Sequence, residues 1–158
     1  MAELEFTTDQ LLEQARGNET GLWHACVLWA KQQPGGIDAW ASFIGETFAP
    51  SWDDMGDASA LEVARVAGLN FATTADIRPV DVSGDDSRAV LTLSGPDQAV
   101  LDDMGTTVED IDRSNEVLFS VIAERRGLTV SFERSADTLR LTFERHARQQ
   151  GGGQSAQF

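Results

Sequence analysis

The hydrophobic residues of this chain change their spacing at about its midpoint. In the first half they recur every three or four residues, as Trp40, Phe43 and Ile44 do, and this period is typical of an amphipathic α-helix. Near the C-terminus they alternate with polar residues, in residues 128–132 and again in residues 139–143, as in a half-buried β-strand. Neither pattern can serve the other structure, so the chain predicts a helical half followed by a sheet.

Local start and stop signals divide the first half into helices. Thr7 or Thr8 can cap a first helix, which we expect to break between residues 17 and 21, where two glycines fall. A second, strongly apolar run covers about residues 20–33, and Pro34-Gly35-Gly36 stops it. The first half therefore begins with two helices in this interpretation.

Two further helices and a hairpin follow. A helix starts near Asp38, and Ser59 with Glu62 forms a capping-box pattern at the start of the next one. Residues 80–82 and 89–93 are apolar segments separated by a turn, which predicts two antiparallel strands.

The last part of the chain predicts a long helix between two hairpins. Pro79 would place the first strand at the edge of a sheet, because proline cannot donate a hydrogen bond to a neighbouring strand. A short helix ends at Gly105, and Thr106 with Glu109 suggests a capping box for a long helix that ends at Gly127. Two alternating strands then close the fold.

Together these elements predict an α+β fold. The N-terminal helices and the long helix would pack on one face of a roughly four-stranded antiparallel sheet made of two hairpins. Residues 1–147 form a single α+β domain in this interpretation, and residues 148–158 form a flexible tail rich in Gly and Gln.

Charge and cysteine content limit the expected partners. The formal net charge of -14 disfavours nucleic acid and anionic membrane surfaces, since both demand a basic face. No apolar run approaches the roughly 20 residues that span a bilayer, and the acidic N-terminus does not resemble a signal peptide. A single cysteine excludes an intrachain disulfide. We therefore expect a cytoplasmic protein without a metal or cofactor.

The make-up of the charge has two explanations. Lys31 is the only lysine, so arginine supplies nearly all of the positive charge. We favour the base composition of a GC-rich genome as the cause of this low lysine content, and adaptation to high salt is the alternative.

All four tryptophans fall in one stretch of the chain, together with the only cysteine and one of the two histidines. Trp23, Trp29 and Trp40 have helical surroundings, and large residues there form core or the wall of a ligand pocket. Trp52 belongs to an acidic loop. We expect it to anchor that loop on the core, and a lid or an exposed partner contact is the alternative.

His24 and Cys26 lie too far apart around a helix to form a catalytic pair. Residues two apart point about 200° apart, so the two side chains face opposite sides. On the helical wheel Cys26 falls with Leu22 and Trp29, which predicts a buried, inert thiol and a histidine that faces solvent.

Asn115 interrupts the apolar stripe of the long helix, which Ile111, Leu118 and Ile122 define. A buried amide without a partner costs about 1–3 kcal/mol, so Asn115 should have a hydrogen bond within the fold or orient a ligand. Glu46 lies at the edge of an apolar helix face. If it were desolvated its pKa would rise, and it could carry a proton.

The second face of the predicted sheet is polar and carries both signs of charge. It consists of Thr129, Ser131, Glu133, Thr138, Arg140, Thr142 and Glu144. Arg and Glu could pair across a two-fold axis there, which favours a homodimer, and plain solvent exposure of this face is the alternative.

Three functions remain open at this point. The favoured one is a non-enzymatic module that binds a small apolar ligand or a partner in a Trp-lined pocket between the Trp-rich helices and the long helix, with Asn115 as the polar anchor. The second is a small enzyme that uses Glu46 as acid or base. The third is an accessory subunit of a larger complex that binds through Trp52. No phosphate-binding Gly-rich loop and no Gly-x-Ser-x-Gly motif is present, so the sequence supports neither nucleotide chemistry nor serine hydrolysis.

Overall fold

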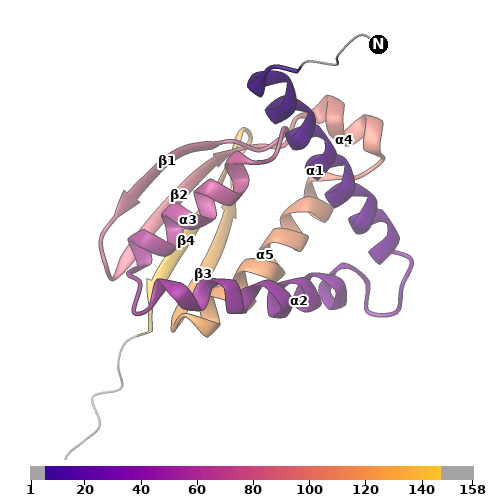
Figure 1. Ribbon diagram of the computed structural model, residues 1–158. Coiled ribbons are helices and arrows are strands. Elements are labelled where there is room, and N and C mark those ends of the chain that lie inside the picture. Colours follow the sequence, from indigo (N-terminus) through magenta and orange to yellow (C-terminus); the bar gives the residue numbers. More distant parts are fainter. Residues whose placement is uncertain (1–5, 147–158) are drawn as a thin grey trace, which may run out of the picture.

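A computed structural model describes residues 6–146, and the predicted C-terminal tail lies outside this range. The chain forms helices and strands in the order α1 (Thr8–Ala30), α2 (Gly36–Phe48), the 3-10 helix η1 (Ala49–Met55), α3 (Ala60–Ala72), β1 (Pro79–Gly84), β2 (Arg88–Ser94), α4 (Gln98–Met104), α5 (Val108–Arg125), β3 (Leu128–Arg134) and β4 (Thr138–Arg145) (Figure 1). The predicted α+β fold is confirmed.

The sheet has four antiparallel strands in the order β1-β2-β4-β3. The predicted edge position of β1 is confirmed, and β3 forms the other edge. Leu91 lies opposite Leu141, and Phe132 lies opposite Leu141 on the other side, so the alternating apolar residues share one face. That face is buried, because the hydrophobic core lies between it and the helices.

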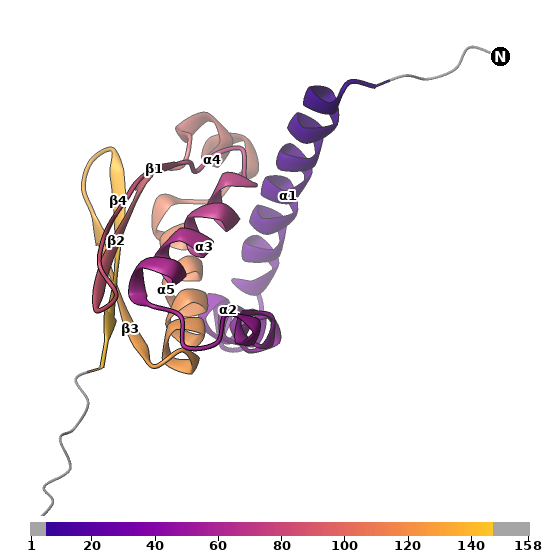
Figure 2. The same ribbon diagram turned by 60° about the vertical axis from the view of Figure 1, so that its left-hand side comes forward.

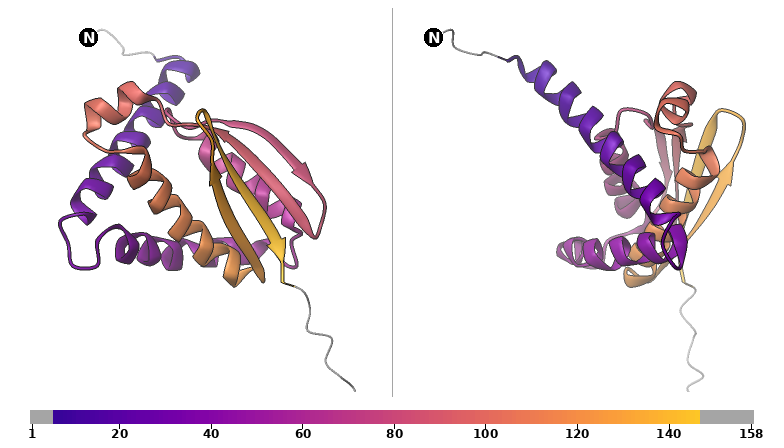
Figure 3. Two further views of the ribbon diagram at one scale, coloured as in Figure 1. Left: turned by 180° about the vertical axis from the view of Figure 1, so that it is seen from behind. Right: turned by 90° about the vertical axis from the view of Figure 1, so that its right-hand side faces the viewer.

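The helices form two layers on this buried face (Figure 2). α3 and α5 pack directly on the strands, and α2 packs along α5. α1 and α2 lie farther from the sheet than α3 and α5, and α1 touches α2, α4 and α5 only sparsely. The opposite face of the sheet has no helix over it in the described part of the chain (Figure 3, left).

The predicted break near residue 20 is wrong, because α1 runs without interruption from Thr8 to Ala30. Gly17 and Gly21 keep helical backbone geometry, since neither has a positive φ. A glycine costs a helix about 1 kcal/mol relative to alanine, and the buried contacts of Thr20, His24 and Val27 on the same helix offset that cost.

The helix caps follow the sequence signals closely. Thr7 caps α1, and Ser59 with Glu62 forms the predicted capping box of α3. The box of α5 lies one residue later than predicted and uses Thr107 with Asp110. Thr106 is not available for this role because its hydroxyl contacts His24.

Within residues 6–146, no helix combines the length and the apolar character needed to cross a bilayer. The cytoplasmic location expected from the sequence stays a prediction.

Two helical glycines should respond to alanine in opposite directions. A Cβ on Gly45 would lie 2.9 Å from Val121 Cβ and 3.1 Å from the Leu118 carbonyl oxygen, where α2 meets α5. We expect Gly45→Ala to lower the free energy of unfolding by about 1–3 kcal/mol, as overpacking does. Nothing lies within 4 Å of a Cβ on Gly17, so Gly17→Ala should raise it by about 0.5–1 kcal/mol. Urea denaturation measures both, and a Gly45→Ala variant as stable as the wild type would contradict close α2–α5 packing.

Candidate functional site

A cavity of about 480 Å³ lies between α1, α2 with η1, α3 and α5. It exists because α1 contacts α2 and α5 but does not pack along α3. Its walls are mostly apolar, and six aromatic side chains contribute to them: Trp23, Trp40, Phe48, Trp52, Phe71 and Phe119. The volume falls within the range of about 300–1,000 Å³ that is usual for small-molecule sites.

The aromatic rings support one another. Trp23 and Trp40 have ring centroids 4.8 Å apart and planes inclined at 59°, so they form two adjoining walls. Phe119 stacks on Phe71 at 5.3 Å and meets the edge of Trp52 at 6.3 Å. Contacts of this kind fix the ring orientations and keep the cavity open in a defined shape.

The Trp23 ring is also fixed by a hydrogen bond. Its Nε1 donates to Ser114 Oγ on α5 at 3.2 Å, and this hydroxyl donates to the Ile111 carbonyl oxygen at 2.8 Å. The indole donor of Trp23 is therefore satisfied within the fold.

Three of the four tryptophans line the cavity, and their role in holding a ligand stays a prediction. Trp29 does not line the cavity, because it is 56% exposed on the outer side of α1, and its expected place in the core or pocket wall is wrong. Trp52 is only 6% exposed, so the interpretation as a loop anchor is confirmed and the exposed partner contact is wrong.

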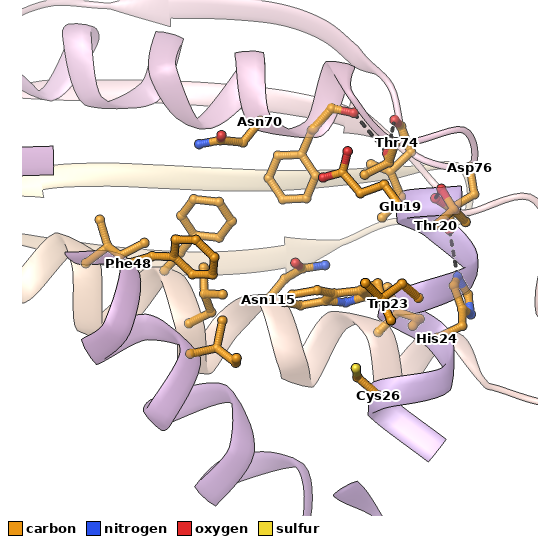
Figure 4. A pocket seen from close by; sticks show the side chains of 18 of the residues that line it. Glu19, Thr20, Trp23, His24, Cys26, Phe48, Asn70, Thr74, Asp76 and Asn115 are labelled. Atoms are coloured by element: carbon orange, nitrogen blue, oxygen red, sulfur yellow. Dashed lines mark hydrogen bonds and ion pairs between the residues drawn. The ribbon is translucent and has the colours of Figure 1, made fainter. Parts of the chain in front are cut away.

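Asn115 is buried at the centre of the site. It is only 6% exposed, and its amide projects from α5 into the cavity beside Trp23 (Figure 4). No side-chain hydrogen bond joins Asn115 to any residue of the described part of the chain. The hydrogen bond within the fold that was the alternative to a ligand is therefore absent among residues 6–146, and the amide atoms stay accessible from the cavity. An amide placed this way can both donate to and accept from a molecule in the cavity.

His24 is buried, with an exposed fraction of 1%, so the predicted solvent-facing position is wrong. Its Nδ1 lies 2.6 Å from Thr106 Oγ1, and its Nε2 lies 3.1 Å from Asp76 Oδ2. Thr20 donates from its hydroxyl to Asp76 Oδ1 at 3.4 Å and accepts from the Ala75 N–H at 2.9 Å. These bonds tie α1 to the loops before β1 and before α5, and we call His24, Thr20, Asp76 and Thr106 the His24 network.

Because of the His24 network, the face of α1 that is buried differs from the face that the sequence predicted. Leu22 and Trp29, which the sequence placed inward, face solvent, and the polar pair of Thr20 and His24 faces the protein. Burial of a polar side chain is favourable only where it finds partners, and Asp76 and Thr106 supply them.

The His24 network has the residue types of a catalytic triad without its access. A hydroxyl, an imidazole and a carboxylate stand in sequence, as in nucleophilic hydrolysis. Thr106 is buried and does not belong to the cavity lining, so a molecule in the cavity cannot reach its hydroxyl. The arrangement joins α1 to the loops before β1 and before α5.

Neither Cys26 nor Glu46 is a buried group. Cys26 is half-buried and lines the cavity, so it is not the fully buried thiol that the sequence predicted. Glu46 is exposed and outside the lining, so it lacks the desolvation that an acid or base role would require, and it does not meet Asn115 in one cleft. On α2 the inward positions belong to Ala41 and Gly45, and the next residue along the chain points outward.

Ion pairs hold the walls of the cavity together. Lys31 at the end of α1 pairs with Asp110 of α5 at 2.6 Å, and Arg113 of α5 pairs with Asp38 of α2 at 2.6 Å. The hydrogen bond from Arg113 holds the pKa of Asp38 below its usual range. Burial alone would raise the pKa of Asp110, and the hydrogen bond and charge of Lys31 outweigh it, so that pKa is lowered as well. Both carboxyls therefore contribute stability above the ordinary aspartate pKa, and lose it as the pH falls through the lowered values.

Among residues 6–146, no group of three or more His, Cys, Asp and Glu side chains is placed to hold a metal ion. Comparison with protein-family models, curated proteins and solved structures finds no match for this chain. The cavity and its lining are therefore the basis for a proposed function.

The residues that sequence reasoning missed are Asp76 and Thr106. Thr20 and His24 are four apart on α1, and this spacing marks a polar pair on one helix face. The pair could have indicated that the face has partners, but Asp76 lies 52 residues away from His24 and Thr106 lies 82 residues away.

Loss of the His24 imidazole should destabilise the fold. In His24→Phe the buried oxygens of Asp76 and Thr106 each lose a partner, so we expect the free energy of unfolding to fall by about 1–3 kcal/mol. His146→Phe is the matched control, because His146 is exposed and a surface substitution usually changes stability by about 0.5 kcal/mol or less. Equal midpoints for the two variants in urea denaturation would show that the network does not stabilise the protein.

Proposed function

We propose that this protein is a non-enzymatic binding module that holds a small, largely apolar ligand in the cavity between α1, α2, α3 and α5. The single observation that carries the proposal is Asn115, a buried amide without a hydrogen-bond partner in the described chain, aimed into a cavity with aromatic walls. The ligand would supply the partner that the protein does not.

The amide of Asn115 faces the cavity and is not sealed in a closed core, because its polar atoms stay accessible from the cavity. Water can satisfy these atoms when the cavity holds no ligand, and a polar group of a ligand can replace that water. A natural protein that keeps such a group at a cavity wall gains specificity from it when a ligand forms the bond.

The residues that line the cavity indicate which kind of ligand fits it. Aromatic rings and aliphatic side chains such as Ile44 and Ile122 surround most of the volume, so the bulk of the ligand is apolar. Its polar part is a single group within reach of Asn115, such as a hydroxyl, a carbonyl or an amine, because an amide can donate to or accept from each of these.

We do not propose the other two functions. The acid or base role needs Glu46 in a desolvated cleft, and Glu46 is exposed. The accessory-subunit role needs Trp52 at the surface, and Trp52 is buried against Phe119.

Replacing Asn115 with leucine should separate the polar anchor from the apolar pocket. We expect wild-type protein to bind naphthol about three- to tenfold tighter than methylnaphthalene substituted at the same ring position, which corresponds to one added hydrogen bond. Asn115→Leu should abolish this preference and retain methylnaphthalene binding, with unfolding stability unchanged or raised. The measurement is displacement of the neutral fluorescent probe N-phenylnaphthylamine from the protein.

Asn18→Leu provides the control for this substitution. Asn18 is an exposed amide on α1 outside the cavity, bonded to Gln14, and its replacement should leave both affinities unchanged. Failure of N-phenylnaphthylamine and of both competitors to bind the wild-type protein would overturn the proposed function.

We also propose the homodimer that the polar sheet face predicted. The outer face of the sheet carries no helix in the described range, and Arg140 is exposed on its β4 strand beside Glu133 of β3. If Arg140 pairs with an acid of a second copy, Arg140→Glu should convert a dimer into a monomer in analytical ultracentrifugation. Arg65→Glu, at an exposed position of α3, should leave the dimer intact, and a monomeric wild-type protein at micromolar concentration would contradict the proposal.

A further inference from the structure

The charged side chains that line the cavity are all acidic, apart from the histidine of the His24 network. Glu19 of α1 and Asp76 of the loop before β1 contribute carboxylates, and no Lys or Arg belongs to the lining. His24 lies between Asp76 and Thr106, with both ring nitrogens already in contact with them. A ligand with a carboxylate or phosphate group would therefore enter without a cation to receive it.

The basic side chains are used elsewhere. Six of the Lys and Arg residues in the described part of the chain form ion pairs with acids outside the cavity lining: Lys31, Arg88, Arg113, Arg125, Arg126 and Arg134. They join helices and strands to one another, so their charge is balanced locally. The cavity is thus left with the sign of charge that dominates the whole chain, whose formal net charge is -14.

Glu19 is placed at the side of the cavity where α1 approaches the end of α3. Its Oε1 accepts a hydrogen bond from Thr73 Oγ1 at 3.0 Å, across the space between the two helices. Figure 4 shows the Glu19 side chain on the same side of the cavity as Thr74 and Asp76, facing the region where Asn115 and Trp23 lie. A carboxylate in this position is exposed to solvent and to any ligand that enters.

The aromatic walls favour the same sign of charge. A cation held over the face of an indole ring is attracted by the negative face of the ring. Trp23 and Trp40 both line the cavity and pack against each other, with ring centroids 4.8 Å apart, so a cation would contact a free ring face and not a space between the two rings. A cleft with low-dielectric walls also concentrates the negative potential of the protein, which raises the local concentration of cations.

From these observations we propose that the ligand is a lipophilic cation, with an apolar body and one protonated amine. The ammonium group donates to the Asn115 carbonyl oxygen, lies against the indole rings, and is attracted by Glu19. This inference rests on the proposed function and adds to it the charge of the ligand.

Three probes with one apolar body and different head groups test this. Naphthylethylamine is a cation at neutral pH, naphthylethanol is neutral and naphthylacetate is an anion. Each competes with N-phenylnaphthylamine on the full chain at physiological ionic strength. We expect the amine to bind about tenfold tighter than the carboxylate, with the alcohol between them.

A matched pair of variants separates the cavity charge from the net charge. Glu19→Gln and Glu46→Gln each remove one carboxylate, but only Glu19 lines the cavity. Glu19→Gln should weaken binding of the amine several-fold and change the affinity of the alcohol less than about twofold, whereas Glu46→Gln should change neither.

The outcomes distinguish this inference from the proposed function. Equal affinity for amine and carboxylate, or tighter binding of the carboxylate, would overturn the cation inference, and binding of the alcohol would then leave the apolar site standing. Equal effects of Glu19→Gln and Glu46→Gln would also overturn it, because the preference would then come from the net charge alone. If N-phenylnaphthylamine and all three probes fail to bind, both the inference and the proposed function fall.

Discussion

The buried His24 network determines how the outermost helix lies on the rest of the molecule. α1 has few contacts with its neighbours, so packing alone does not fix which of its faces turns inward. The imidazole between Asp76 and Thr106 fixes it, because each of these buried groups would lose its partner if the helix rotated. The position of α1 in turn sets one wall of the cavity. Trp23 directly precedes His24 in the sequence, so the bonds that hold His24 also place Trp23 in the cavity lining.

The same arrangement explains why the cavity is present at all. A helix held by polar bonds near one end of α3 and by the Lys31–Asp110 pair at its own C-terminus need not pack along α3. The space between them is closed by aromatic rings from α1, α2, η1, α3 and α5. Asn115 lies on α5 beside Trp23, so the helix that packs on the sheet carries the polar group of the cavity.

Much of the fold could be predicted because its signals are local. The strand alternation around Val130 and Leu141, the capping box of Ser59 and the edge position of Pro79 each depend on residues close in sequence. Asn115 could be singled out for the same reason, since it breaks an apolar stripe on its own helix. The exposure of Trp29 and the burial of His24 could not, because they depend on partners from distant loops.

The sequence by itself determined most of the helix boundaries, the two hairpins, the acidic character and the presence of one polar residue in an apolar stripe. These follow from periodicity, turn chemistry and composition, which act over a few residues. Only the tertiary structure decided which face of α1 is buried and which tryptophans meet Asn115 around a cavity. The physical reason is that a polar residue can be buried where it has hydrogen-bond partners. The partners of His24 lie 52 and 82 residues away along the chain, so residues near it in the sequence do not reveal its burial.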